Sequence, residues 1–168
     1  MGMVWSARLA NNEDLVRLRA APSMVRSFVE PENELQFLEA RPDSLYLDKE
    51  WHLIHFLLSG SAGLTGSKRD VVLGDFESVG EDNGYGPPWI IPTLALRDFV
   101  EAIAPISKED LQAHFDPEAM RNQQVYLADA FGDEPEDSFE GLIQRLGDLA
   151  VFARKGAMEG RHAIAMLS

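Results

Sequence analysis

The chain has 168 residues, 45% of them hydrophobic and 26% charged, which is typical of one globular domain rather than of a disordered chain. The formal net charge of −13 disfavours nucleic-acid and anionic-membrane partners, because binding to phosphates requires clustered Lys and Arg. The absence of cysteine excludes disulfides, thiolate nucleophiles and cysteine-based metal sites. We expect a single domain covering residues 1–168.

Neither membrane insertion nor secretion is predicted. No apolar run approaches the ~18 residues that span a bilayer, and the N-terminus lacks a basic stretch followed by a hydrophobic segment. We therefore expect a cytoplasmic protein.

The N-terminal part of the chain predicts one strand and two short helices. Hydrophobic and polar residues alternate over Met3–Leu9, the pattern of a half-buried strand. The apolar spacing within Asn12–Glu30 predicts two short helices divided at Pro22. The segment Glu30–Pro42 is acidic, and we expect it to be irregular.

A central helix is predicted between Asp48 and Gly60. Asp48 is expected to be its N-cap, and Gly60 to end it with a left-handed residue. One face of this helix carries Trp51, Ile54, His55 and Leu58. The neighbouring surface is apolar too, which is typical of an interior helix. We expect His55 to lie in the core and His52 to lie nearer the polar face.

Five later segments carry structural signals. Val71–Leu73 predicts a short strand or a helical turn, and Thr93–Ile103 predicts a helix capped by its first residue. Ser107 followed by Asp110 resembles a capping box, and Asp116-Pro117 marks the start of another short helix. Ser138 is expected to cap the longest helix.

A last apolar segment, Arg161–Leu167, predicts a terminal strand, so both ends of the chain are expected in one sheet. We count about five to seven helices against three to five short strands. This combination indicates an α/β domain in which helices cover a mixed sheet of short strands. An α+β arrangement is the alternative.

Four segments carry recognisable patterns: the opening Met1-Gly2-Met3, the central helix Asp48–Gly60, the loop Asn83–Pro87 and the turn Phe115–Met120. Together they resemble the YfbM-like family, whose members are bacterial, cytoplasmic and classed as domains of unknown function. The resemblance runs nearly end to end and implies a compact three-layer α/β domain. It implies no catalytic residues, because none are established for the family.

Two positions depart from the pattern of that family. Pro88-Trp89 stands where relatives usually carry a basic residue, and Tyr126-Leu127 stands where they continue into Tyr-Pro. A ligand held by that basic residue in relatives would not be held in the same way here.

The central helix carries the first candidate site. Asp48, His52 and His55 fall within two turns, which suits acid–base chemistry or contact with a ligand. A zinc site would need a third protein ligand, which no motif supplies, and Asp48 is engaged as a cap. The favoured interpretation is a structural, hydrogen-bonded His55, with contact to a ligand or substrate as the alternative. We predict no metal and no cofactor.

The loop Asn83–Trp89 carries the second candidate site. Gly84 and Gly86 allow close approach of the backbone, and Tyr85 and Trp89 offer flat contact surfaces. The favoured interpretation is a rigid turn with Trp89 docked in the core, and ligand contact is the alternative. The loop lacks a P-loop or a dinucleotide motif, so it predicts no nucleotide.

The sequence holds no complete catalytic set, which favours a binding or accessory protein. Its partner would be a basic protein that meets the acidic segments Asp70–Asp82 and Asp129–Glu140, or a small molecule in a pocket. The residues expected to line that pocket are Trp51, His52, His55, Tyr85 and Trp89. The alternative is a small hydrolase or transferase in which His55 or His52 acts as general base beside Tyr85. The sequence predicts no oligomeric state.

Overall fold

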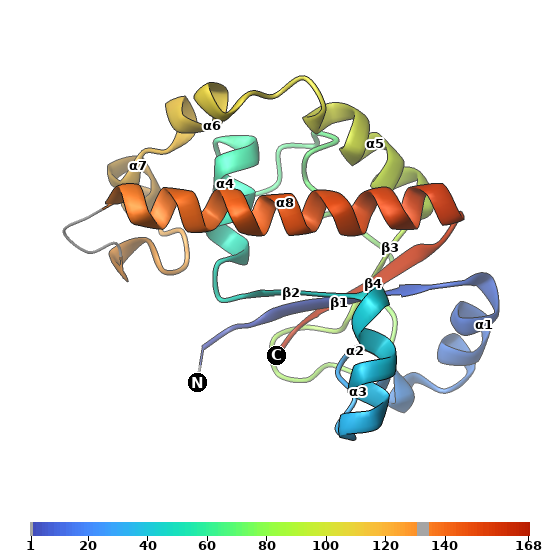
Figure 1. Cartoon of the computed structure of the whole chain (residues 1–168). Coiled ribbons are helices and arrows are strands. Elements are labelled where there is room, and N and C mark those ends of the chain that lie inside the picture. The colour runs from blue at the N-terminus through green and yellow to red at the C-terminus, as the bar shows by residue number, and fades with distance from the viewer. Residues whose placement is uncertain (1, 131–134) are drawn as a thin grey trace.

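The computed structural model describes residues 2–130 and 135–168, the side chains of residues 135–137 excepted. Within these residues, four strands form one sheet in the order β2-β1-β4-β3. The strands are β1 (Trp5–Ala10), β2 (Ser44–Asp48), β3 (Trp89–Ile91) and β4 (His162–Leu167). The first and last strands of the chain therefore lie side by side at the centre of the sheet (Figure 1).

The pairings between these strands are all antiparallel, which corrects the expected mixed sheet. The positions at which β2 and β4 begin explain why both run antiparallel to β1. β2 begins at Ser44 opposite Arg8, near the end of β1, and β4 begins at His162 opposite Ala10. Each strand thus starts beside the end of β1 and runs back along it. The expected α/β class, with helices covering a sheet of short strands, is confirmed.

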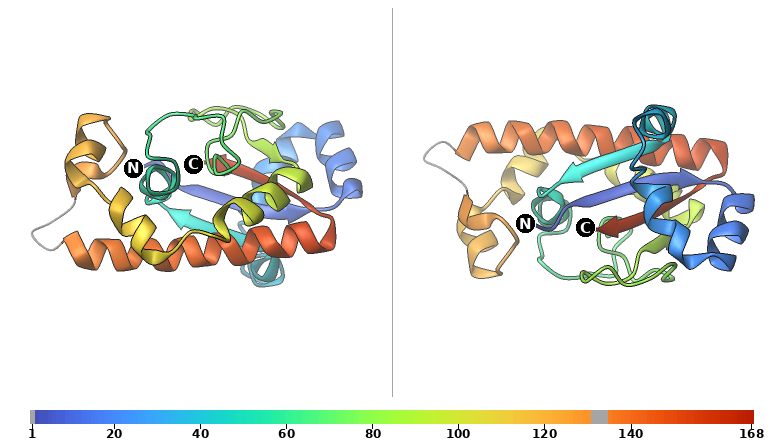
Figure 2. Two further views of the ribbon diagram at one scale, coloured as in Figure 1. Left: turned by 90° about the horizontal axis from the view of Figure 1, so that it is seen from above. Right: turned by 90° about the horizontal axis from the view of Figure 1, so that it is seen from below.

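Helices lie on both faces of the sheet and give the three layers that were expected (Figures 1 and 2). One face carries α4 (Trp51–Ser59), α5 (Thr93–Ile103), α6 (Lys108–His114), α7 (Pro117–Asn122) and α8 (Pro135–Glu159). The other face carries α1 (Asn12–Ala20), α2 (Val25–Val29) and α3 (Glu34–Ala40). Among the described helices, none is both long and apolar enough to cross a membrane.

Local signals placed some helix starts correctly and misplaced others. The capping box at Ser107 is present, and the Asp116 side chain accepts a backbone N–H at the start of α7. Thr93 is not a cap, because Pro92 occupies the N-cap position of α5. Ser138 cannot cap α8, which begins three residues earlier. The segment expected to be irregular contains α3, capped by the Asn33 side chain.

The two central strands send alternate side chains into two separate cores. Trp5 and Ala165 belong to the larger core, against α4, α5 and α8, whereas Ile164 and Met166 belong to a smaller core against α1 and α2. The Trp5 indole is fully buried, and its Nε1 donates to the Val72 carbonyl at 3.2 Å. Burial on both faces explains why β4 is apolar from Ala163 to Leu167 rather than alternating.

The smaller core covers only one end of its sheet face. Leu15, Leu18 and Val25 pack beneath the end marked by Ala10 and Ile90. Figure 2, right, shows α1 and α2 over that end, while the end of the sheet beside the two chain termini is clear of them. This uncovered area determines where the candidate site lies.

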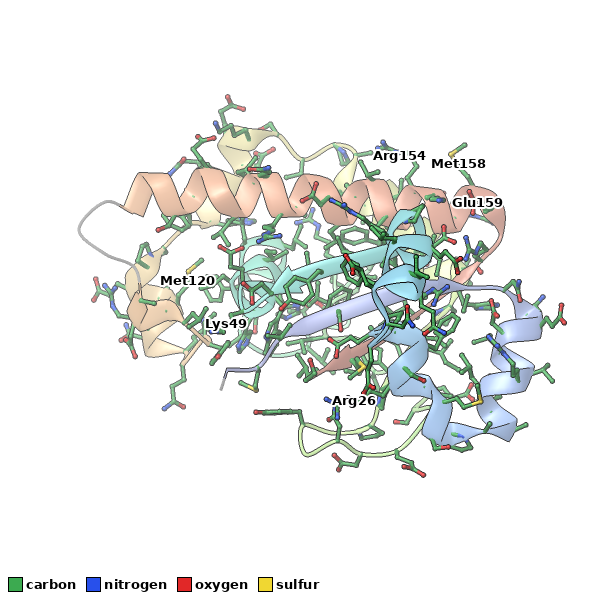
Figure 3. All side chains as sticks on the ribbon, turned by 60° about the horizontal axis from the view of Figure 1, so that its bottom comes forward. Arg26, Lys49, Met120, Arg154, Met158 and Glu159 are labelled. Atoms are coloured by element: carbon green, nitrogen blue, oxygen red, sulfur yellow. The ribbon has the colours of Figure 1, made fainter. Side chains whose placement is uncertain are left out.

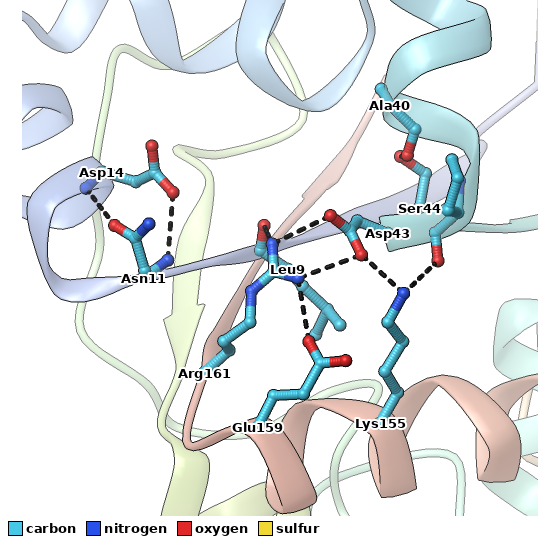
Figure 4. A network of polar contacts seen from close by, with 10 residues as sticks. Leu9, Asn11, Asp14, Ala40, Asp43, Ser44, Lys155, Glu159 and Arg161 are labelled. Atoms are coloured by element: carbon cyan, nitrogen blue, oxygen red, sulfur yellow. Dashed lines mark hydrogen bonds and ion pairs between the residues drawn. The ribbon is translucent and has the colours of Figure 1, made fainter.

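Asp43, in the turn before β2, holds the C-terminal end of α8 against the sheet (Figure 4). Its carboxylate pairs with Lys155 at 2.8 Å and with Arg161 at 3.0 Å. Arg161 also donates to the Leu9 carbonyl, and Lys155 donates to the Pro42 carbonyl. Burial disfavours the charged form of Asp43, but the hydrogen bonds from both cations outweigh this effect, so its pKa is held below its ordinary value.

We expect Asp43→Asn to lower the free energy of unfolding by about 1–2 kcal/mol at pH 7, because two partly buried cations lose their anion. The pKa of Asp43 is lower in the folded state than in the unfolded state. The stabilisation is therefore complete above about pH 5 and is lost as the pH falls through the folded-state pKa. Urea denaturation of both proteins over this pH range measures the difference.

The control is Asp98→Asn, which removes an ion pair with the exposed Lys68 and should change stability by about 0.5 kcal/mol or less. An Asp43→Asn effect that is the same at every pH would contradict the role given to the carboxylate.

Candidate functional site

The helix α4 is interior, as its sequence predicts: seven of its nine residues are buried, and Gly60 ends it with a φ of 72°. Asp48, however, is not its N-cap. It is the last residue of β2, opposite Trp5, and has a φ of 52°. Strand pairing fixes Asp48, so the N-cap position falls to Glu50, which makes no side-chain cap bond.

His55 is fully buried, which confirms the core position predicted for it. Its Nε2 lies 3.0 Å from the Gly63 carbonyl oxygen, so this nitrogen carries the proton and donates. Its Nδ1 is buried without a hydrogen-bond partner among the described residues. An imidazole enclosed in this way cannot reach a substrate.

His52 is held through both ring nitrogens. Its Nδ1 accepts the backbone N–H of Tyr126 at 2.9 Å, so Nε2 carries the proton and donates to the Ala62 carbonyl at 2.8 Å. The ring stacks on Trp51 with 4.9 Å between centroids and 5° between planes. Burial lowers the pKa of His52, and the bond to Ala62 only partly opposes this effect. The ring is therefore neutral, with no free lone pair.

The two imidazoles of α4 have a structural role, because they bind the carbonyls of Ala62 and Gly63 and the backbone N–H of Tyr126 to the helix. A general base or a metal ligand needs a lone pair that these bonds do not leave on His52. Within the described residues, no group of three or more His, Asp or Glu side chains is arranged to hold a metal ion.

The loop before β3 is the rigid turn that was predicted. The Asp82 carboxylate accepts the backbone N–H of Gly84 at 2.7 Å and that of Gly86 at 3.1 Å. The Asn83 side chain accepts the N–H of Tyr85, and its amide donates to the last carbonyl of β4. Both glycines have φ near +97°, a conformation that other residues rarely adopt. Tyr85 is thereby presented at a fixed place, 41% exposed.

The structure does not bring all five residues that were expected to share a pocket together. Trp51 stacks on His52 and on Tyr126, and the His55 ring lies 6.4 Å from that of His52. Trp89 instead lies in β3, packed against the larger core. Tyr85 instead lies at a hollow on the half-covered face of the sheet, which neither His52 nor the other three residues line. This hollow therefore does not place a histidine base beside Tyr85.

This hollow, which we call the sheet groove, encloses about 1240 Å³. Its floor comes from β1 and β2, where Ser6 lies opposite Tyr46. Its walls come from α2 and α3 and from the loop that carries Tyr85; at the β2 edge of the sheet the hollow continues to α8, which packs on the opposite face. The lining includes Ser6, Arg26, Glu30, Phe37, Arg41, Tyr46, Lys49, Asn83, Tyr85, Asp148, Phe152, Lys155 and Ser168.

Glu30 ties the floor of the sheet groove to its wall. Its Oε1 accepts the hydroxyl of Ser6 at 2.7 Å and that of Ser168 at 3.0 Å. These bonds join the segment after α2 to β1 and to the residue that follows β4. None of the four histidines lines the groove, so Ser6 has no imidazole base beside it. The geometry suits binding better than nucleophilic chemistry.

The charge of the sheet groove is opposite in sign to that of the molecule. Its lining carries the four bases Arg26, Arg41, Lys49 and Lys155 against the two acids Glu30 and Asp148. The whole chain has 15 Lys and Arg residues against 28 Asp and Glu residues. Bases are therefore concentrated in the groove. Tyr46, on the floor, has a raised pKa because of burial and the nearby acids Asp48 and Glu30.

Sequence reasoning missed most of this groove. Its four bases come from a short helix, a turn, a strand end and the longest helix, so no local motif joins them. One signal was available: α3 carries Leu35, Phe37 and Leu38, which are all more than half exposed. Apolar residues in an acidic segment that was expected to be irregular indicate a helix with an unpaired surface.

Comparison with known proteins gives consistent matches. The model of a family described as a domain of unknown function (DUF1877) matches residues 1–166. Protein YfbM of Escherichia coli strain K12 is 25% identical over 129 residues, which are 73% of this chain and 75% of that protein. The crystal structure of YfbM from Escherichia coli, a protein of unknown function, superposes with a TM-score of 0.74 at 18% identity. It covers 98% of this chain and 99% of that one.

We expect His52→Gln to lower the free energy of unfolding by about 1–2 kcal/mol at pH 8, because two hydrogen bonds are disturbed. The pKa of His52 is lower in the folded state, so the unfolded chain binds a proton first as the pH falls below about 6.5, and the wild type loses stability there. The variant lacks this loss. The difference between the two proteins, measured by urea denaturation, should therefore shrink between pH 8 and pH 5, and a constant difference would contradict a neutral, buried ring.

Proposed function

We propose that this chain, which belongs to the YfbM-like family of domains of unknown function (DUF1877), is a binding protein whose sheet groove takes up a small molecule. The observation that carries this proposal is the groove itself, a preformed hollow of about 1240 Å³ lined by aromatic, aliphatic, hydroxyl and charged side chains. Small-molecule sites are usually concave, largely apolar and about 300–1,000 Å³ in volume, with a few fixed polar groups.

Exposed aromatic side chains around the groove support the proposal. Phe37, Tyr46 and Tyr85 come from α3, β2 and the loop before β3, and are 54%, 52% and 41% exposed. Exposed aromatic rings that are gathered around one hollow are typical of a surface that binds a partner or a ligand. A ligand in the groove would cover all three rings at once.

The rigidity of the groove supports it further. Ser6 and Tyr46 lie in paired strands, Glu30 is bonded to two hydroxyls, and the loop with Tyr85 is held by Asp82 and Asn83. A site built in this way needs little ordering when it binds, which favours affinity.

Of the residues predicted to contact a ligand, Tyr85 fits this site. Trp51, His52, His55 and Trp89 line no part of the groove, and their contact with a ligand stays a prediction. The basic protein partner also stays a prediction, and so do the cytoplasmic location and the bacterial source that the family resemblance implies. The acidic segment from 129 to 140 lies partly outside the described residues.

The proposal is tested with four naphthalene compounds that share one ring and differ in a head group: 2-naphthamide, 2-naphthylmethylammonium, 2-naphthoate and 2-naphthyl phosphate. Backbone amide shifts in the NMR spectrum of the whole chain report where each compound binds. We expect at least one compound to shift the amides of Ser6, Tyr46 and Tyr85 while those of α4 stay unchanged. Tyr85→Ala should lower the affinity for that compound by about 3- to 10-fold, which is the contribution of one aromatic contact.

The matched control is Leu94→Ala, which removes an exposed apolar side chain from α5, outside the groove. It should leave affinity unchanged. If none of the four compounds shifts the groove amides, or if the shifts centre on His52 and His55, the proposed function is wrong.

A further inference from the structure

We infer that the ligand of the sheet groove is a small organic anion, in which a carboxylate or phosphate group is attached to an apolar ring. The inference rests on the proposed function, because it names the class of molecule that the same groove takes up. Its basis is the arrangement of Arg26, Arg41 and Lys49 around the three exposed aromatic rings.

The side chains of three of the four groove bases have no partner among the described residues. Lys155 is engaged with Asp43 and with the Pro42 carbonyl. The side chains of Arg26, Arg41 and Lys49 are exposed and make no hydrogen bond or ion pair within residues 2–130 and 138–168. In a chain with 28 acidic residues, three unpaired bases around one hollow are available to an outside anion.

The acids of the groove do not cancel these bases. Glu30 keeps its negative charge, but its Oε1 is occupied by the hydroxyls of Ser6 and Ser168, and the lining as a whole still has two more bases than acids. Asp148 lies on α8, where it also borders a smaller hollow with Glu50 and Arg145. A cationic ligand would therefore meet three unpaired like charges, whereas an anion would meet three partners.

The bases approach the groove from separate elements. Arg26 lies on α2, Arg41 in the turn after α3, and Lys49 just after β2. Figure 3 shows Arg26 and Lys49 apart from each other around the uncovered part of the sheet. The bases therefore make the hollow positive from separate sides, while the apolar part of the ligand lies against Phe37, Tyr46 and Tyr85.

The negative charge of the whole molecule does not prevent this binding. At physiological ionic strength, charges separated by more than about 8 Å are largely screened, so the distant acidic residues contribute little to the potential inside the groove. A nucleic acid would cover far more of the acidic surface than a small anion does, and the net charge of −13 opposes it.

The four naphthalene compounds test this inference on the whole chain by isothermal titration calorimetry. We expect 2-naphthoate and 2-naphthyl phosphate to bind about 8- to 125-fold more tightly than 2-naphthamide, because each of the three exposed bases contributes about 2- to 5-fold. 2-Naphthylmethylammonium should bind most weakly. The ratio between the phosphate and the carboxylate identifies which anion the bases suit better.

The triple variant Arg26→Gln, Arg41→Gln, Lys49→Gln should remove the preference for anions and leave the affinity for 2-naphthamide unchanged. Arg154→Gln removes the same kind of charge from the side of α8 turned away from the sheet (Figure 3) and should change nothing. The three single variants, each checked by circular dichroism and thermal melting, show the same trend if the triple variant is unstable.

Two outcomes separate this inference from the proposed function. If 2-naphthamide or the ammonium compound binds in the groove as tightly as the anions, or if the preference for anions survives the triple variant, the anion assignment is wrong and the groove remains a binding site. If none of the compounds binds there, the proposed function itself is wrong.

Discussion

The antiparallel pairing of β1 with β4 is the contact on which the rest of the molecule depends. Six residues of each strand are in register, and mutual hydrogen bonds of 2.9 Å between Val4 and Ser168 extend the pair by one further step. Both strands are buried on both faces, so each separates the two cores and contributes to both. The outer strands β2 and β3 pair with β1 and β4 respectively, so this central pair joins all four strands into one sheet.

The connection between β1 and β2 explains why the molecule has a hollow. The 33 residues between β1 and β2 form only short helices, and these pack beneath one end of the sheet. The other end keeps polar side chains, Ser6 and Tyr46, where a fully covered sheet would carry apolar ones. An uncovered polar floor bordered by aromatic rings is what distinguishes this face from the opposite one, which is covered by the longest helix.

Much of the fold could be predicted from local signals, and most of the candidate site could not. Alternation at Met3–Leu9 and the apolar run at Arg161–Leu167 identified the central strands, and the apolar surface around His55 placed α4 in the core. Periodicity reports which side of an element is buried but not which elements become neighbours. The groove depends on such neighbours: Ser6 meets Tyr46 through strand register, and Glu30 reaches Ser168 across 138 positions of the chain. The histidines were candidates for a site because imidazole can act as a base or a ligand, but in the structure His52 and His55 form hydrogen bonds to backbone carbonyls of the following loop.

The bond from Glu30 to Ser6 and Ser168 has a consequence for how the hollow behaves in time. Since this carboxylate joins the segment after α2 to both central strands, the floor of the hollow is tied to the middle of the sheet. A ligand held against Ser6 would therefore slow the exchange of backbone amides in β1 and β4 with solvent.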